Sequence, residues 1–419
     1  MAEKGIVVRE YEEERDRLRA EAMERMCEVG PSGEMSLFTD HLGDPASRVR
    51  HSPAFLMLVA EKSGPVKEIV GLIRGSVKTV TCGKTISRNA AAAPAAAAKR
   101  HDPLPIPIYT KVAYILGLRV SPFYRRMGTG MKLVRRLEDW FKEQGAEYAY
   151  MATEKDNEAS IRLFTGRCGY SKFRTPAILV HPVFAHRRTI PGSVRILRLP
   201  PADAETLYRR RFSTTEFFPR DIDAVLSNPL SFGTFLAVPA AAASGGRGGW
   251  EWPGAEEFLA APPESWAVVS VWNCGGVFRL EVRGASRVRR GLAWATRAAD
   301  RALPWLRIPS VPDIFRPFGA LFLYGIGGEG PAAAGMVGAL CRHAHNMGRG
   351  APGGCGVVAA EVAACDPLRR GIPHWRRLSC AEDLWCVKRL AEGYGDGGAV
   401  GDWTKSTPGE SIFVDPREL

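Results

Sequence analysis

The chain has 419 residues, of which 45% are apolar, and it carries a net charge of +12 at pH 7. This length exceeds what one hydrophobic core usually serves and predicts two domains. No apolar run of 18 residues occurs, which argues against a helical membrane span, and the charged first residues do not resemble a signal peptide. Nine cysteines without a C-x-x-C pair favour free thiols in a reducing compartment and argue against a zinc site.

The first part of the chain alternates strand-like and helix-like segments. Residues 6–26 predict a strand and then a helix, and residues 68–80 and 113–120 predict two further strands. An Ala- and Pro-rich stretch at 87–107 separates these two strands, and an Ala- and Gly-rich stretch occupies 240–254. We expect both stretches to be exposed inserts within a domain, the first of them an expanded hairpin loop.

A glycine-rich turn follows the predicted strand at 113–120. It reads RVSPFYRRMGTG, with the spacing Arg125-x-x-Gly128-x-Gly130, and leads into an amphipathic helix at 131–145. Glycines let a ligand approach the backbone, and a helix N-terminus offers free N–H groups and positive potential. The dinucleotide fingerprint G-x-G-x-x-G and the pattern G-x-x-x-x-G-K-[ST] are both absent. A pyrophosphate site is the first hypothesis, and an ordinary glycine turn is the alternative.

The loop and the segments after it resemble the GCN5-related N-acetyltransferase (GNAT) superfamily. The Arg-x-x-Gly-x-Gly spacing is similar to that family's acetyl-CoA loop, and a strand-like run at 146–153 comes next. In the following segment, residues at the spacing of the family's N-x-x-A-x-x-L-Y-x-x-x-G-[FY] pattern are Asn157, Leu163, Phe164, Gly169 and Tyr170. The resemblance implies a mixed-sheet α/β fold that uses acetyl-CoA as co-substrate and needs no metal.

A closer resemblance extends over roughly residues 6–390. The segments 27–45, 211–223, 262–274, 323–331 and 371–390 look like those of the plant HOOKLESS-type N-acetyltransferases. That resemblance implies acetyl transfer to an amine, with a protein lysine as acceptor, in a plant protein of hormone-controlled differential growth. It also favours a nuclear over a cytoplasmic location, with a histone or another chromatin protein as partner. The alternative is a non-catalytic acyl-CoA-binding regulatory or scaffold protein.

The resemblance also assigns residues to the co-substrate. The backbone around Arg125 to Gly130 is expected to hold the pyrophosphate, while the strand before it and the helix after the next strand contact the pantetheine arm. The cofactor-binding residues predicted in this way are Leu118, Val120, Arg125, Arg126, Met127, Gly128, Thr129, Gly130, Asn157 and Phe164.

The catalytic residues are where the chain departs from the family pattern. The tyrosine that protonates the leaving thiolate in that family falls at Phe164, which has no acidic proton. The strand at 113–120 carries no carboxylate, so Glu154 is the candidate general base, with Tyr114 and Tyr109 behind it. A surface loop carboxylate is the competing interpretation of Glu154.

The second part of the chain repeats the pattern of the first. Residues 193–212 again predict a strand and a helix, and GIGGEG at 325–330 precedes a predicted helix at 331–348. A strand follows at 354–367, and 371–390 is expected to close the second sheet. We therefore predict two tandem GNAT-like domains, at 6–185 and 193–391, and a tail at 392–419. The second is predicted to be a degenerate copy, because Glu329 in its loop argues against pyrophosphate.

The positive net charge suits an acidic partner or an anionic co-substrate. The basic residues are spread out, and the densest segment, at 283–303, is interpreted as a helix with a solvated basic face. Direct nucleic-acid binding is not favoured, since no basic patch is interleaved with aromatic residues. We expect no membrane partner. The acidic run at 154–158 is the candidate contact for a basic acceptor.

Overall fold

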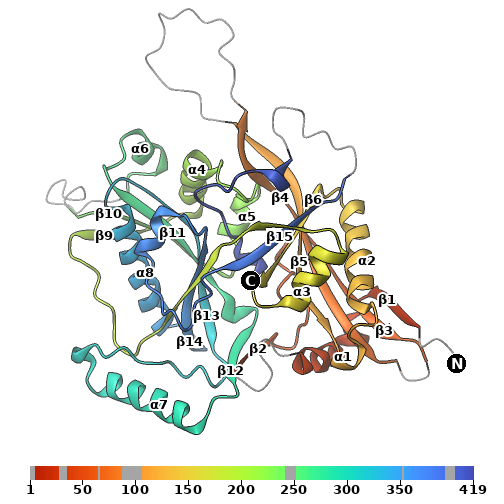
Figure 1. The fold of residues 1–419 in the computed structure, drawn as a ribbon. Helices are drawn as coiled ribbons and strands as arrows, with labels where there is room; N and C mark the ends of the chain where they lie inside the picture. Colours follow the sequence, from red (N-terminus) through yellow and green to blue (C-terminus); the bar gives the residue numbers. More distant parts are fainter. Residues whose placement is uncertain are drawn as a thin grey trace, which may run out of the picture.

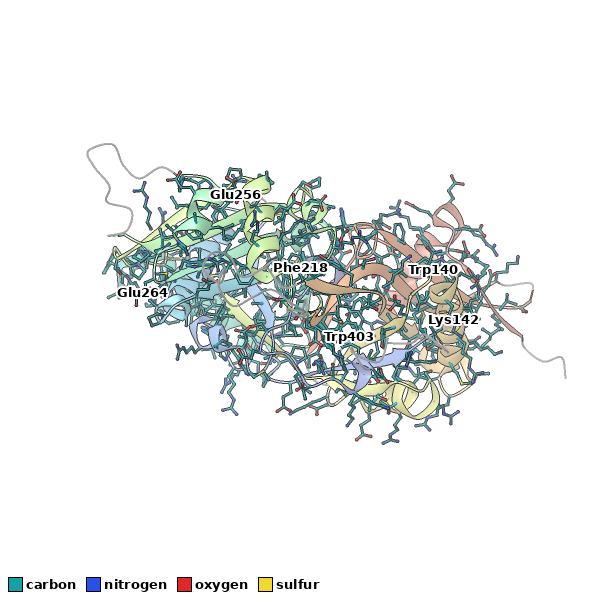
Figure 2. The ribbon with its side chains drawn as sticks, turned by 90° about the horizontal axis from the view of Figure 1, so that it is seen from above. Trp140, Lys142, Phe218, Glu256, Glu264 and Trp403 are labelled. Atoms are coloured by element: carbon teal, nitrogen blue, oxygen red, sulfur yellow. The ribbon has the colours of Figure 1, made fainter. Side chains whose placement is uncertain are left out.

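The chain is described here from a computed structural model, which covers residues 5–27, 35–64, 67–86, 106–240, 252–351, 353–391 and 402–419. Two mixed sheets lie side by side, each covered by its own helices (Figure 1). Seen from above, Phe218 and Trp403 lie between the halves, with Trp140 and Lys142 in one half and Glu256 and Glu264 in the other (Figure 2).

The first sheet has seven strands and contains the predicted co-substrate loop. Its neighbours are antiparallel except for one parallel pair, β5 with β6. The helices of this half are α1 (Glu13–Met26), α2 (Thr129–Glu143) and α3 (Glu158–Arg167). In spatial order the strands are β1 (Ile6–Glu10), β3 (Ala54–Lys62), β4 (Ile69–Ile86), β5 (Ile106–Val120), β6 (Tyr148–Glu154), β15 (Asp383–Arg389) and β7 (Ser171–Arg174).

The second sheet has six strands and again contains one parallel pair, β13 with β14. In spatial order the strands are β8 (Ala177–Pro182), β14 (Cys355–Val362), β13 (Gly319–Glu329), β11 (Trp266–Asn273), β10 (Ser231–Pro239) and β9 (Val194–Leu199). Its helices are α4 (Pro201–Phe212), α5 (Ile222–Leu226), α6 (Ala255–Ala260), α7 (Arg287–Ala302) and α8 (Ala333–Arg349). A small ribbon of β2 (Ser36–Asp40) and β12 (Arg279–Arg283) joins the two halves.

The two halves exchange a strand. β15, near the end of the chain, lies between β6 and β7 of the first sheet, and β8 from the first half forms the edge of the second sheet beside β14. The expectation that 371–390 closes the second sheet is therefore wrong, because strand periodicity does not specify the sheet that a strand joins. The domain limits 6–185 and 193–391 stay predictions, but neither segment contains all the strands of one sheet.

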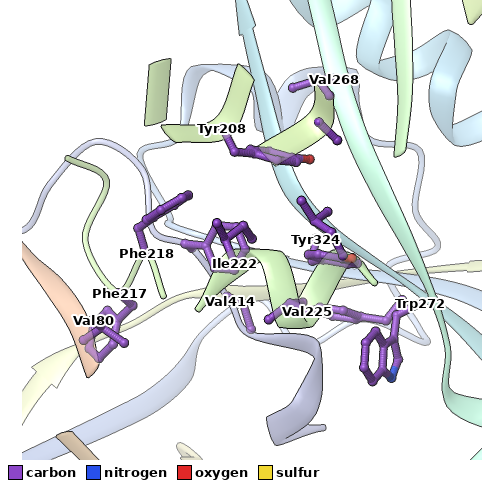
Figure 3. Close-up of a cluster of buried hydrophobic side chains, with 14 of the residues drawn as sticks. Val80, Tyr208, Phe217, Phe218, Ile222, Val225, Val268, Trp272, Tyr324 and Val414 are labelled. Atoms are coloured by element: carbon purple, nitrogen blue, oxygen red, sulfur yellow. The ribbon is translucent and has the colours of Figure 1, made fainter. Parts of the chain in front are cut away.

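A single apolar core joins the halves. It runs from Val80 on β4 and Tyr150 on β6 to Tyr208 on α4 and Tyr324 on β13. The close-up shows Phe217 on the same side of the core as Val80, with Phe218 and Val414 between that side and Tyr208 and Tyr324 (Figure 3). Because a shared core resists relative motion far more than a polar contact would, the halves form one packed body.

The end of the chain belongs to this interface. Residues 392–401 of the predicted tail lie outside the described residues, but Phe413 to Glu418 are buried. Asp415 lies 3.3 Å from Lys78 and 2.7 Å from Arg417, and Arg417 also binds Asp221. These pairs link the first sheet, the second half and the last residues, so the predicted tail is a structural element.

The predicted hairpin, the basic helix and the buried tryptophans are all present in the described structure. β4 and β5 form the predicted hairpin, whereas most of both low-complexity stretches lies outside the described residues. The basic segment contains α7, whose Arg287, Arg289 and Arg290 are exposed. Trp266, Trp272 and Trp385 are buried as expected. No helix in the described ranges combines the length and apolar character needed to cross a bilayer.

Strand exchange predicts that the first half cannot fold alone. A fragment of residues 1–190 lacks β15, which leaves β6 and β7 without their shared partner and exposes the buried faces that β15 covers. We expect this fragment to show no cooperative thermal transition by circular dichroism. Co-expression with 191–419 should restore one transition at the temperature of the full chain. Cooperative unfolding of the isolated fragment would contradict the interpretation.

Candidate active site

The parallel pair at the centre of the first sheet opens into a gap. β5 and β6 are in register from Val112 opposite Tyr148 to Ile115 opposite Met151, and their pairing ends there. Beyond that point β5 continues along β4, while β6 continues along β15. The facing backbone edges of both strands therefore have no strand partner among the described residues over their last positions. An extended amide-containing ligand can pair with such edges.

A bulge bends β5 at the start of the gap. Its register with β4 changes between Leu116 and Arg119, and Gly117 between them has φ +63°. A side chain at Gly117 would meet the Arg74 guanidinium, since an added Cβ lies 2.5 Å from Nη1. The predicted contact residues Leu118 and Val120 are half-buried on the free stretch that follows.

The predicted phosphate loop ends at an open helix N-terminus. Gly128 is the N-cap of α2 with φ +78°, a conformation that favours glycine, and the helix has no side-chain cap. A Cβ at Gly128 would meet nothing within 4 Å, and one at Gly130 would meet only side chains, at 3.4 Å or more. The first amide N–H groups of α2 are thus left for a ligand, and Thr129 is buried beneath them.

Basic side chains surround this helix start. Arg125 and Arg126 are exposed, as is Met127, and Arg126 has φ +62°. Arg125 donates from Nε to the carbonyl oxygen of Val120 at 3.3 Å, which keeps its guanidinium beside the gap. Free amide donors, helix dipole and arginines at one place fit the charge of a pyrophosphate.

Two predicted contacts lie on α3. Asn157 caps this helix, since its side-chain oxygen accepts from the backbone N–H of Ser160 at 3.2 Å. Phe164 is fully buried beneath the sheet and packs edge-on against Tyr170, with ring centres 5.2 Å apart. Their contacts with a co-substrate stay predictions.

The two predicted catalytic residues have different surroundings. Tyr114 stacks on Tyr150 with ring centres 4.7 Å apart, and burial raises the pKa of Tyr114 well above its usual value. Tyr114 is therefore protonated at neutral pH, and its role in catalysis stays a prediction. Glu154 is the exposed last residue of β6 and lies opposite Asp383 of β15. Its role as base stays a prediction.

Sequence reasoning missed two carboxylates beside this position. Asp383 on β15 and Glu361 on β14 are both buried, and the indole Nε1 of Trp385 donates to Oε1 of Glu361 at 3.0 Å. Burial raises the pKa of Glu361 to about 8, helped by the charge of Asp383. Burial also raises the pKa of Asp383 to about 6, helped by Glu154. No spacing in the sequence relates them, because Glu361 stays on β14 of the second sheet while strand exchange places Asp383 in the first sheet.

The second glycine-rich segment has a different role from the first. Residues 325–329 are part of β13 and do not form the expected loop. Gly325 has φ +58°, and a Cβ there would lie 2.5 Å from the Tyr208 hydroxyl, while one at Gly328 would lie 2.7 Å from the Trp266 carbonyl oxygen. The structure therefore favours close packing over phosphate binding here and agrees with a degenerate second copy.

Comparison with known proteins identifies the family. Residues 16–170 match the acetyltransferase (GNAT) family model. Over 99% of its length the chain is 62% identical to the whole of probable N-acetyltransferase HLS1 of Arabidopsis thaliana. The chain belongs to the HOOKLESS-type group of the GNAT acetyltransferases. It is also 40% identical to acetyl transferase GW6a of Oryza sativa subsp. japonica, covering 99% of this chain and 97% of that protein.

Solved structures with the same family name also align with this HOOKLESS-type chain. A GCN5-related N-acetyltransferase from Kribbella flavida aligns with 92% of this chain and 71% of its own, at 12% identity and a TM-score of 0.42. The relatives and the family model support an N-acetyltransferase over the scaffold alternative. Acetyl-CoA is the co-substrate of the family, and the open loop and strand gap of the first half fit it.

The raised pKa of Glu361 predicts a pH-dependent stability. A carboxyl whose pKa rises on folding, here to about 8, keeps its proton in the folded state where the unfolded chain has lost it. Stability is therefore lost as the pH rises from about 4.5 to about 8. We expect Glu361→Gln to match wild type at pH 5 and to exceed it at pH 9 by on the order of 3 kcal/mol in urea denaturation.

Glu382→Gln is the matched control for this measurement. Glu382 is adjacent to Asp383 in sequence but is exposed and pairs with Lys155 at 3.0 Å. An exposed pair contributes little, so this variant should follow wild type within about 0.5 kcal/mol at both pH values. An equal difference between Glu361→Gln and wild type at pH 5 and pH 9 would show that Glu361 has an ordinary pKa.

Proposed function

We propose that this HOOKLESS-type enzyme transfers the acetyl group of acetyl-CoA to a lysine side chain of a protein. The observation that carries the proposal is the gap between β5 and β6, which opens toward the free N-terminus of α2. An extended thioester arm in the gap and a pyrophosphate on the loop would place the acetyl group near Tyr114 and Tyr150, where the strands separate. A primary amine is the acceptor that this reaction class uses.

The biological setting is part of the proposal and is supported by the resemblance to the Arabidopsis relative. We infer a role in hormone-controlled differential growth of a plant, a nuclear location, and a histone or another chromatin protein as acceptor. Histone tails are basic, and this chain carries a net charge of +12, so a basic acceptor needs local negative charge at the site. Glu154 and Asp383 at the outer end of the gap supply it.

Phe164 stands where the family has an acid for the leaving thiolate, and this affects the expected rate of acetyl transfer. A phenylalanine cannot protonate the thiolate that leaves when the acetyl group is transferred. Tyr114 is half-buried on β5, and because burial raises its pKa well above the usual value, it holds its proton too tightly to give it readily to a thiolate. We infer that the thiolate takes its proton from water or from another hydroxyl, which would make turnover slower than with an acid at position 164.

Acetyl-CoA binding tests the proposed site directly. Gly130→Glu introduces a carboxylate at the open helix start where the pyrophosphate is expected, and like charges at close range cost several kcal/mol. We expect isothermal calorimetry to give one acetyl-CoA per wild-type chain and at least about 100-fold weaker binding for Gly130→Glu.

The control is the same substitution on an exposed helix of the second half. Gly291 lies on α7, and a Cβ there meets nothing within 4 Å. Gly291→Glu should bind acetyl-CoA as wild type does. Equal binding by Gly130→Glu would exclude the loop at 125–130 as the site, and two acetyl-CoA molecules per chain would restore the second glycine segment as a candidate.

A further inference from the structure

Glu361 and Asp383 differ from most buried carboxylates of the described chain. Buried carboxylates normally have a cationic partner, because leaving one unpaired costs several kcal/mol. Within the described ranges neither Glu361 nor Asp383 forms an ion pair with a lysine, arginine or histidine. Such partners are present for Asp16, Glu24, Glu61, Glu138, Glu216, Asp300, Asp415 and Glu418.

A second feature distinguishes Glu361. Only its Oε1 accepts a hydrogen bond, from the Trp385 indole, and Oε2 has no donor among the described residues. The residue is 8% exposed and Asp383 is 5% exposed, so both retain a little contact with solvent. The charge of Asp383 raises the pKa of Glu361, so the two carboxylates lie close enough to interact. Oε2 is therefore open to a hydrogen-bond donor that comes from the solvent side.

The two carboxylates lie on the reactive side of the gap. Tyr150 and Trp385 belong to the core between the halves, with ring centres 5.4 Å apart, whereas the alternate residue Met151 faces the core beneath α2. Asp383 is two residues from Trp385 on the same strand and therefore shares its face. A line of side chains thus leads from the point where the strands separate, past Trp385, to Asp383 and the exposed Glu154.

We propose that Glu361 and Asp383 bind the ammonium group of the acceptor and that Glu361 removes its proton. This inference rests on the proposed function and names the acceptor class as a primary alkylammonium, such as a lysine side chain. Two carboxylates with no resident cation suit one positive charge, and their low exposure suits a small cationic end group. Among the described residues no group of three or more His, Cys, Asp or Glu is arranged to hold a metal, which favours the organic cation.

The proposed step balances without another reactant. One N–H bond of the ammonium breaks, and its proton forms an O–H bond on the Glu361 carboxylate. The neutral amine nitrogen then bonds to the acetyl carbon, and the C–S bond breaks with its electron pair staying on sulfur. A second proton leaves the nitrogen and ends on sulfur, which gives the N-acetyl product and free CoA. Glu361 finally returns the first proton to solvent through Asp383 and Glu154.

Direct binding can be tested without knowing the protein acceptor. The probe is n-butylammonium, which mimics the end of a lysine side chain, and 1-butanol is its neutral counterpart. Saturation-transfer NMR with the full chain should show saturable binding of n-butylammonium and none of 1-butanol. Glu361→Gln and Asp383→Asn should each abolish the signal. Both substitutions preserve side-chain shape, and the amide oxygen introduced by Glu361→Gln can still accept from Trp385, so the variants should fold.

Turnover provides the second measurement. Wild type with acetyl-CoA and n-butylamine should form N-butylacetamide, detected by mass spectrometry. Glu361→Gln should lower kcat/KM for the amine at least about 100-fold, the range expected for loss of a general base, and remove the acid limb of its pH profile. Its acetyl-CoA affinity should stay within about twofold of wild type, because the carboxylates lie outside the loop that holds the pyrophosphate. Glu382→Gln should retain wild-type kcat/KM, and Glu154→Gln should lose less than about tenfold.

The variants separate an error in the acceptor site from an error in the proposed acetyltransferase function. If Glu361→Gln and Asp383→Asn keep amine binding and turnover while Gly130→Glu loses turnover, the chain is still an acetyltransferase and this acceptor site is wrong. If wild type does not bind acetyl-CoA, the proposed function fails, and the NMR titration of the full chain still decides whether the carboxylates bind an alkylammonium. Equal binding of n-butylammonium and 1-butanol would overturn the charge-based site.

Discussion

The exchange of β8 and β15 is the constraint on which the rest of the structure depends. Each sheet needs a strand from the other half of the chain, so neither sheet is complete without both halves. β15 fills the space between β6 and β7, and it is the strand that carries Trp385 and Asp383 to the active face. The proposed acceptor site therefore requires the folded full chain, and the second half contributes to it even though its own glycine segment is closed.

Buried ion pairs lie at the same interface that the exchanged strands create between the two halves. Lys78 on β4 lies between Asp415 and Glu418, and Arg417 connects Asp415 with Asp221 of the second half. Buried ion pairs give little net stability, because desolvation opposes their attraction, but losing one partner leaves a buried charge. These pairs therefore fix the position of the chain end more than they stabilise the fold. Tyr150, which donates to Glu418, links that position to the strand gap.

The features that sequence could predict are those made by consecutive residues. The open turn at Gly128 and Gly130, the helix after it and the hairpin of β4 and β5 are local, and their spacing carries the information. Glu361 and Asp383 could not be found in this way, because their meeting depends on which sheet β15 joins. The glycines of 325–330 led to a wrong expectation of a loop, because a glycine-rich sequence can arise for two different structural reasons. A glycine can admit a ligand or a neighbouring aromatic ring, and only the location of Tyr208 decides between them.

The two halves share one architecture, but within the described residues only the first has an open glycine turn at a helix start. Both have a glycine of positive φ where a central strand of the half bends, Gly117 in one and Gly325 in the other. Both also lose parallel pairing shortly before that glycine, after Ile115 and after Leu323. In the first half the gap continues to an open helix start, whereas in the second the glycines are filled by aromatic rings. The second copy has thus lost the space for a phosphate, but its part of the chain still supplies Glu361 and Trp385. We infer that the second copy is retained for its strands and side chains. This explains why its glycine segment is closed although the half shares strands and a core with the first half.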